Sequence, residues 1–394
     1  MKLIDHVRVG HYQVGTTKTY SKLEAFELSR RLNVPYSWTF YEEVYSKFDW
    51  TTEPPMSIWE LYSLRAKQIR EEYDYVILFL SGGADSMTVL NSFAQNNLFI
   101  DEIVSVVSIE NGGSLVSGLD QNAVLNSETF RAAIPLFNRI KKDYPIYQNT
   151  KHTFIDVQSA VSRFFKSFDS KDFLYTQNTM FTPTAIAKFD CLSDLPSCNE
   201  QLGLGKKVCI LYGHDKPNFV ESDGNLNFVF INSFDGMVSP RSLMFNRIEV
   251  PVVFFFSDPQ FPLIPIKQSH LVKQFLHNPK LDNDFANDHP FRSKLQLKSS
   301  SEKVKFLSLE GLNRIIYPPN CWDPTTFSRG KPKTMMKSES DDWFFKFDTP
   351  ERKTYLDGIK LLNTIYPVGV KKHDDIMAGI LIDSSRPYYI GRLE

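Results

Sequence analysis

The stretch that decides the fold reads Tyr75-Val76-Ile77-Leu78-Phe79-Leu80-Ser81-Gly82-Gly83-Ala84-Asp85-Ser86. Its first six residues form an apolar run without polar alternation, which is typical of a strand covered on both faces. The residues that follow, 85–96, place Met87, Leu90 and Phe93 on one helical face. The segment therefore predicts a buried strand, a tight glycine loop and an amphipathic helix.

Strand-like and helix-like runs keep alternating to about residue 260. Further strands are expected at residues 103–107, 153–157, 208–212 and 252–256. Residues 227–231 are consistent with another strand and equally with one arm of a hairpin. Residues 127–142 predict a helix with a kink or a break at Pro135, because proline cannot donate the helical hydrogen bond. Strands separated by helices at this spacing indicate βαβ units, so the predicted fold class is α/β, with a Rossmann-like parallel sheet flanked by helices.

Three zones follow from this pattern. Residues 1–72 form a lead-in that is too short for a large core of its own, and it is expected to pack on the main domain. Residues 73–260 form the α/β domain. Residues 261–394 form a mixed, helical and irregular extension, because prolines and a polar stretch interrupt any regular sheet. Helices outside the α/β domain are expected at residues 21–32, 57–72, 266–276 and 350–365, and Ser57 followed by Glu60 predicts a capping box at the start of the second. The third of these includes Lys267, which is read as either a surface lysine or part of a closing lid.

The composition narrows the class of protein. The 394 residues are 42% apolar and 23% charged with a formal net charge of −1, and no block of five like charges occurs. Nothing in the charge therefore indicates a nucleic-acid partner, although a balanced sum can hide a local basic patch. The start lacks the apolar core of a signal peptide, and no run approaches the ~18 apolar residues of a membrane span.

The cysteines indicate a reducing compartment. The chain contains four, with no paired CxxC motif, at Cys191, Cys198, Cys209 and Cys321. So few cysteines in so long a chain do not indicate a disulfide framework, and their spacing does not match a zinc site. A cytoplasmic location without a membrane partner is expected.

The loop between the first strand and helix has the chemistry of a polyphosphate site. Gly82 and Gly83 allow backbone angles that a Cβ forbids and let main-chain amides approach a ligand. The helix start directs its amides and positive dipole end at the same point. Ser81 and Ser86 add hydroxyl donors, and Asp85 is expected to cap the helix and, with magnesium present, to serve as a metal ligand. The alternative is a tight turn in which these side chains serve only as caps.

Better-known phosphate loops do not fit. The chain has no GxxxxGK[ST], and no GxGxxG follows a strand. Instead, residues 81–86 resemble the SGGxDS signature of the PP-loop ATP pyrophosphatases, whose motif also lies between a strand and a helix. The resemblance implies a Rossmann-like sheet of the HUP type, binding of ATP with magnesium, and release of pyrophosphate after adenylation of a substrate oxygen. It also implies that Ser81, Gly82, Gly83, Ala84, Asp85 and Ser86 contact ATP.

Within that superfamily the chain resembles the asparagine-synthetase-like branch, which includes phage-encoded relatives. Residues 48–54, the helix after them and the loop carry this likeness. The branch places a metal-binding acid after a later strand, and here that strand ends in Gly213-His214-Asp215-Lys216-Pro217. The resemblance implies that Gly213 contacts ATP, that Asp215 joins Asp85 at magnesium, and that Lys216 neutralises phosphate charge. An ordinary exposed turn is the alternative. Ser108 and Ile109 follow the second strand, where relatives bind adenine and ribose.

The expected function is that of an AMP-forming ligase or amidotransferase, with Asp85, Ser86, Asp215 and Lys216 as its catalytic residues. The substrate, small or macromolecular, is a carboxylate or an amide oxygen that an amine or ammonia attacks after adenylation. The lead-in is too short for the glutaminase domain of asparagine synthetases, so a separate ammonia or amine donor is expected. Two alternatives stay open. One is a sulfur-transfer enzyme of the tRNA thiolase or sulfonucleotide reductase type, and the other is a nucleotide-binding module without catalysis.

Overall fold

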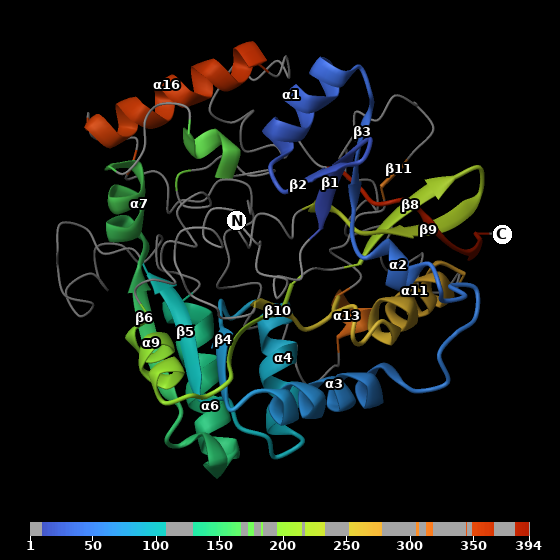
Figure 1. Ribbon diagram of the computed structural model, residues 1–394. Coiled ribbons are helices and arrows are strands. Elements are labelled where there is room, and N and C mark those ends of the chain that lie inside the picture. The colour runs from blue at the N-terminus through green and yellow to red at the C-terminus, as the bar shows by residue number, and fades with distance from the viewer. Residues whose placement is uncertain are drawn as a thin grey trace.

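The computed structural model describes most of the chain in twelve parts (Figure 1). They are residues 10–107, 129–166, 172–176, 183, 195–214, 217–232, 252–277, 305–306, 313–317, 344, 349–365 and 383–393. The strands in these parts form three sheets, one parallel and two antiparallel.

A five-stranded parallel sheet confirms the predicted α/β class. Its five strands lie in the order β10-β7-β4-β5-β6. They are β4 (Tyr75–Phe79), β5 (Glu102–Val107), β6 (Lys151–Asp156), β7 (Val208–Tyr212) and β10 (Val252–Phe254). From β4 the chain first builds the sheet toward β6 and then returns to add β7 and β10 on the other side. The direction of building therefore reverses between β4 and β7, the arrangement in which Rossmann-like sheets bind their ligands.

Helices connect and cover these strands. They are α4 (Ala84–Ala94), the π-helix η2 (Thr129–Ala133), α6 (Ile134–Asp143), the 3-10 turns η3 (Pro145–Tyr147) and η4 (Asp172–Thr176), α7 (Val157–Lys166) and α9 (Pro196–Gly203). The helical run continues through Pro135 without a break, but its hydrogen-bond pattern changes nearby: η2 ends at Ala133, and α6 begins at Ile134, one residue before the proline. The single apolar stripe expected for α4 is too narrow: every residue of this helix except Asp85 is buried. Helix α3 (Ile58–Glu72) packs on α4, so α4 is covered by a helix as well as by the sheet (Figure 1).

The lead-in contains a small sheet and two further helices. Its elements are β1 (His11–Val14), β2 (Thr17–Thr19), β3 (Tyr36–Thr39), α1 (Lys22–Leu32) and α2 (Glu42–Tyr45). The capping box predicted at the start of α3 is present, with Ser57 and Glu60 each accepting the other's backbone amide. The Trp50 ring stacks on Phe228 and on Tyr388, with distances between ring centroids of 4.9 Å and 4.6 Å. Aromatic side chains therefore join the lead-in to the strands described next.

The second antiparallel sheet has the order β11-β8-β9-β12. Its strands are β11 (Lys305–Phe306), β8 (Asn218–Ser222), β9 (Asn225–Val229) and β12 (Tyr388–Arg392). The hairpin reading of residues 227–231 is the correct one, since β9 pairs antiparallel with β8. The pairing of β12 with β9 joins the end of the chain to its middle and was not predicted.

The described helices of the extension include α11 (Leu263–Leu276), α13 (Asn313–Ile316) and α16 (Pro350–Ile365). Lys267 in α11 is neither a surface nor a lid residue. Its ammonium is buried, forms an ion pair with Glu53 at 2.5 Å, and donates to the Pro54 carbonyl. In the described parts, no helix combines the length and the apolar character needed to cross a bilayer.

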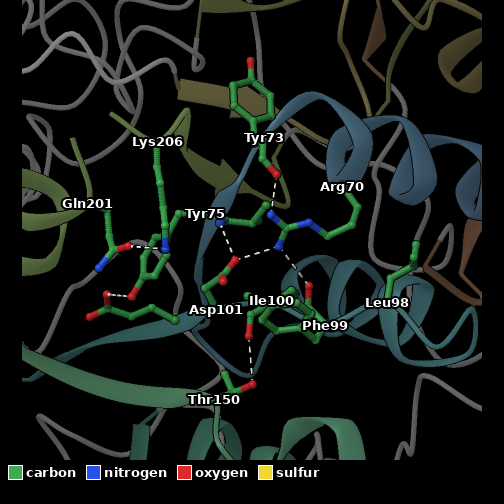
Figure 2. Close-up of polar contacts among 12 residues, drawn as sticks. Arg70, Tyr73, Tyr75, Leu98, Phe99, Ile100, Asp101, Thr150, Gln201 and Lys206 are labelled. Carbon is green, nitrogen blue, oxygen red and sulfur yellow. Dashed lines mark hydrogen bonds and ion pairs between the residues drawn. The ribbon is translucent and has the colours of Figure 1, made fainter. Parts of the chain in front are cut away.

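The amino ends of the parallel strands carry a polar network (Figure 2). Asp101 accepts from the Arg70 guanidinium at 2.7 Å and from the Val76 amide at 2.8 Å. The fully buried Glu102 accepts from the Tyr75 hydroxyl at 3.1 Å and also from the Thr153 hydroxyl. Lys151 lies 3.4 Å from Glu102, and Lys206 donates to Gln201 at 2.7 Å. Each buried carboxylate at this edge therefore has named donors, as a stable fold requires.

Candidate functional site at the carboxyl ends of two strands

The loop of residues 81–86 leaves the carboxyl end of the central strand β4 and enters α4. Gly82 adopts φ +75°, a conformation that side chains disfavour. A Cβ added there would lie 2.5 Å from the Ala133 amide nitrogen and 2.6 Å from the Ala132 Cβ. Glycine at this position is therefore required twice, by its backbone angle and by the close packing of η2 against the loop.

The end of β7 meets the same loop. A Cβ on Gly213 would lie 2.7 Å from the carbonyl carbon of Asp85 and 2.9 Å from the amide nitrogen of Ser86. Only a residue without a side chain allows this approach, so the ends of β4 and β7 converge on the first turn of α4. The two predicted segments, residues 81–86 and Gly213, thus lie together although about 130 residues separate them, because neighbouring parallel strands end at the same edge.

Hydroxyl groups are gathered inside the loop. The Ser81 hydroxyl accepts from the Gly83 amide at 3.2 Å and lies 3.4 Å from the Ser86 hydroxyl. The Ser86 hydroxyl in turn donates to the Gly83 carbonyl at 3.2 Å. The structure therefore brings together the two serines that the sequence assigns to the phosphates.

The expectation that Asp85 caps α4 is wrong. Gly83 is the N-cap residue, and Asp85 is the second residue of the helix. Its carboxylate accepts a hydrogen bond from the Tyr317 hydroxyl, a residue that follows α13. A side chain inside the first turn is displaced from the position in which a cap accepts from the amides of the second and third residues. Asp85 is thus available for a role other than capping.

Parts of the loop reach solvent and parts do not. Ser81 is exposed and Asp85 is half-buried, whereas Gly82, Gly83 and Ala84 are buried. The glycines therefore pack against protein and hold the loop in shape, while the exposed hydroxyl and the carboxylate can meet a ligand. The loop is not sealed within the core.

A hydrogen-bond chain from the sheet fixes the end of β4. The Ser105 hydroxyl donates to the Leu80 carbonyl at 2.8 Å and lies 3.0 Å from Nε2 of His152. Since the one hydroxyl proton of Ser105 goes to Leu80, Nε2 of His152 must carry the proton that Ser105 accepts. Burial lowers the pKa of His152 to about 4, with the charge of Lys141 adding to the effect, so the ring is neutral near pH 7. His152 is therefore part of the loop's support and carries no charge for a ligand.

Four predicted site residues lie outside the described residues: Ser108, Ile109, Asp215 and Lys216. Of the described residues, no group of three or more His, Cys, Asp or Glu side chains is placed to hold a metal ion. Magnesium bound together with a nucleotide takes only one or two protein carboxylates, because the phosphates and water supply its other oxygens. A single partly exposed carboxylate at the loop, that of Asp85, fits this requirement.

The described cysteines are unsuited to sulfur chemistry. Cys198 and Cys209 are buried free thiols. Burial raises the pKa of Cys198 to about 12, with Glu102 adding to the shift, and burial also raises the pKa of Cys209 well above its usual value. Since the thiolate is the nucleophile, both are unreactive near neutral pH. Cys191 and Cys321 lie outside the described residues.

Tyr317 is the site residue that sequence reasoning missed. It lies 232 positions from Asp85 along the chain, and its segment has no motif that points to the loop. No local pattern could have predicted this contact. No protein-family model matches this chain, and no curated protein matches it either. The loop and its place in the sheet are therefore what supports a function.

Proposed function

We propose that this protein binds ATP at residues 81–86 and cleaves it between the α- and β-phosphates to adenylate a carboxylate or an amide oxygen. The observation that carries the proposal is the place of the Ser-Gly-Gly-Ala-Asp-Ser sequence. It follows the central strand of a parallel sheet, precedes a helix, and lies where the order of strand addition reverses. Polyphosphates bind at such a place because helix-start amides and glycine backbones approach them there.

Each described residue of the site has a role in this proposal. Gly82 lets η2 pack closely against the loop, and Gly213 keeps the approach of β7 to the first turn of α4 free of a side chain. The Ser81 hydroxyl acts with the loop amides as a donor to the β- and γ-phosphates, and the Ser86 hydroxyl joins them by turning its one proton from the Gly83 carbonyl to the phosphate. Asp85 is the carboxylate that would hold magnesium, whose charge stabilises the pyrophosphate that leaves. Asp215 and Lys216 remain predicted partners at the same edge.

The chemistry that this site serves is activation of a poor leaving group. A substrate oxygen attacks the α-phosphorus, the bond from that phosphorus to the oxygen bridging the β-phosphate breaks, and pyrophosphate leaves. Donors fixed at the loop before the reaction stabilise the charge that develops on it. An amine or ammonia from a separate source then attacks the activated carbon, and AMP leaves with the transferred oxygen. Sulfur transfer receives no support from the two buried, protonated thiols described above.

A matched pair of serines in α4 tests the proposal. Ser86 and Ser92 are both buried, and each donates its hydroxyl to a carbonyl one turn earlier, at 3.2 Å and 2.7 Å. Only Ser86 lies in the loop. We expect Ser86→Ala to lower AMP and pyrophosphate formation by about a hundredfold or more, as for loss of one donor to a developing charge. We expect Ser92→Ala to retain the activity.

The assay separates AMP from ADP after incubation with ATP, magnesium, ammonia and a panel of carboxylic acids. Binding of α,β-methylene-ATP, which cannot be cleaved at the α–β bridge, is followed by calorimetry in parallel. Formation of ADP and phosphate would contradict the proposal. Binding of the analogue without AMP formation from any acid in the panel would favour the non-catalytic nucleotide-binding module.

A further inference from the structure

The contact between Tyr317 and Asp85 joins the C-terminal extension to the loop. The Tyr317 hydroxyl donates to Oδ1 of Asp85, and the ring of Tyr317 is 2% exposed. That ring also packs on Phe256, which follows β10, with ring centroids 5.6 Å apart. The side chain is therefore held at both its ring and its hydroxyl.

Two other elements fix the backbone that carries Tyr317. The Tyr62 hydroxyl, from α3, donates to the Ile316 carbonyl at 2.8 Å. Gln268, from α11, donates to the same Tyr62 hydroxyl at 2.9 Å. Both side chains in this chain of contacts, Tyr62 and Gln268, are buried. Contacts with α3 and α11 thus help to fix the backbone from which the Tyr317 hydroxyl reaches the loop.

A carboxylate in the first turn of a helix has a competing partner. The amides of its own helix start attract it, because they carry positive partial charge and lack partners within the helix. Those same amides are the donors that a bound phosphate needs. A fixed hydroxyl that donates to the carboxylate lowers the cost of holding it away from them.

We infer that Tyr317 is a positioning residue of the nucleotide site. Its hydroxyl orients the Asp85 carboxylate toward the metal ion of a metal–nucleotide complex and away from the amides at the start of α4. The C-terminal extension thereby completes a site whose other described parts come from the α/β domain. This inference rests on the proposed function, since it requires that a nucleotide binds at the loop.

The test measures binding of the Mn²⁺ complex of α,β-methylene-ATP, with free Mn²⁺ read by electron paramagnetic resonance. Tyr317→Phe removes the hydroxyl and keeps the ring on Phe256. We expect it to weaken binding of the complex about tenfold, as for loss of a hydrogen bond to a charged group. We expect its affinity for the metal-free analogue, measured in EDTA, to stay unchanged. A role limited to holding the fold would lower both affinities together.

A second variant shows whether Tyr317 acts through Asp85. In the Asp85→Ala background, Tyr317→Phe should cause no additional loss of affinity for the Mn²⁺ complex, because the carboxylate that the Tyr317 hydroxyl orients is gone. If Tyr317→Phe lowered the affinity equally in the wild-type and the Asp85→Ala proteins, the inference would be overturned.

Tyr147→Phe is the matched control. It removes a buried tyrosine hydroxyl that donates to the Leu98 carbonyl at 2.7 Å at the opposite edge of the sheet. It should lower thermal stability without changing binding of the Mn²⁺ complex.

The outcomes separate the two proposals. If the wild-type protein binds neither the Mn²⁺ complex nor the metal-free analogue, the proposed function fails and this inference fails with it. If the wild-type protein binds the complex and Tyr317→Phe binds it equally well, only the inference about Tyr317 is overturned. Thermal melting of each variant confirms that the affinities are compared between folded proteins.

Discussion

The two edges of the parallel sheet differ in how their polar groups are used. At the amino edge, Asp101 and Glu102 are surrounded by donors from Arg70, Tyr75 and the backbone (Figure 2). At the carboxyl edge, glycines bring backbones together, a serine hydroxyl is exposed, and Asp85 is half-buried. The first arrangement satisfies each carboxylate within the fold, whereas the second leaves polar groups where a ligand can reach them.

The difference indicates which edge of the sheet serves the stability of the fold and which edge is suited to bind a ligand. A saturated ion pair holds the fold and has little capacity left for a ligand. Glycines in a positive-φ or close-contact position cost conformational entropy, so a fold retains them where a backbone must approach something closely. We therefore expect substitutions at the amino edge to change stability alone, and substitutions at the carboxyl edge to change nucleotide binding as well.

The largest effect on stability is expected at the amino edge. Asp101→Ala removes the carboxylate that accepts from the Arg70 guanidinium and the Val76 amide. The guanidinium keeps the Tyr73 and Phe99 carbonyls as acceptors but loses its ion pair, and the free energy of unfolding should fall by about 3 kcal/mol. Asp74→Ala is the control, because the exposed Asp74 carboxylate accepts only from a backbone amide, that of Lys207 at 2.9 Å, among its described hydrogen bonds. Denaturant unfolding measures both. If folded Asp101→Ala bound the nucleotide more weakly than the wild type, the expectation that the amino edge affects stability alone would be wrong.

An intermediate effect is expected at the carboxyl edge. Gly213→Ala places a Cβ 2.7 Å from the backbone of Asp85 and should cost about 2 kcal/mol of stability through overpacking. Because the displaced backbone is that of the loop, affinity for α,β-methylene-ATP should also fall at least tenfold. Gly203→Ala is the matched control: it meets no atom within 4 Å at the end of α9 and should leave binding unchanged. Gly213→Ala with full affinity would show that the end of β7 is not part of the site.

The smallest effect on stability is expected at His152, which lies between the two edges of the parallel sheet. Its pKa is lowered from 6.5 to about 4, so the folded protein keeps the ring neutral at pH values where the unfolded chain protonates it. The free energy of unfolding that this group contributes is therefore fully present above about pH 6.5 and is lost as the pH falls toward 4. We expect on the order of 1 kcal/mol, allowing for solvent access to the ring. Unfolding at pH 7 and pH 4.5 should show a smaller difference for His152→Gln than for the wild type, and equal differences would refute this account.

Local patterns predicted the elements that place the site. The run from Tyr75 predicted β4 because a strand buried on both faces needs apolar residues in sequence. Ser57 and Glu60 predicted their capping box because both hydrogen bonds span three residues. The glycine loop and its serines were located in the same way.

Contacts between distant segments escaped prediction. The full burial of α4 depends on α3, and the ion pair of Lys267 depends on Glu53, 214 positions away. The strand β12 pairs with a hairpin about 160 residues earlier in the chain. The sequence of one segment does not reveal its distant partner. A contact between distant segments requires matching shape and charge at the contact, and it does not require a repeated pattern along either segment.

By itself, the sequence determined the class of the fold, the position of the loop and the chemical nature of its side chains, since all three are expressed over a few consecutive residues. Only the tertiary structure decided that Gly213 lies against the first turn of α4, that Asp85 is not a cap, and that Tyr317 contacts it. The physical reason is that hydrogen bonds and close packing act over a few ångströms in space, whatever the separation along the chain. A site assembled from strand ends and a remote tyrosine is therefore complete only after the chain has folded.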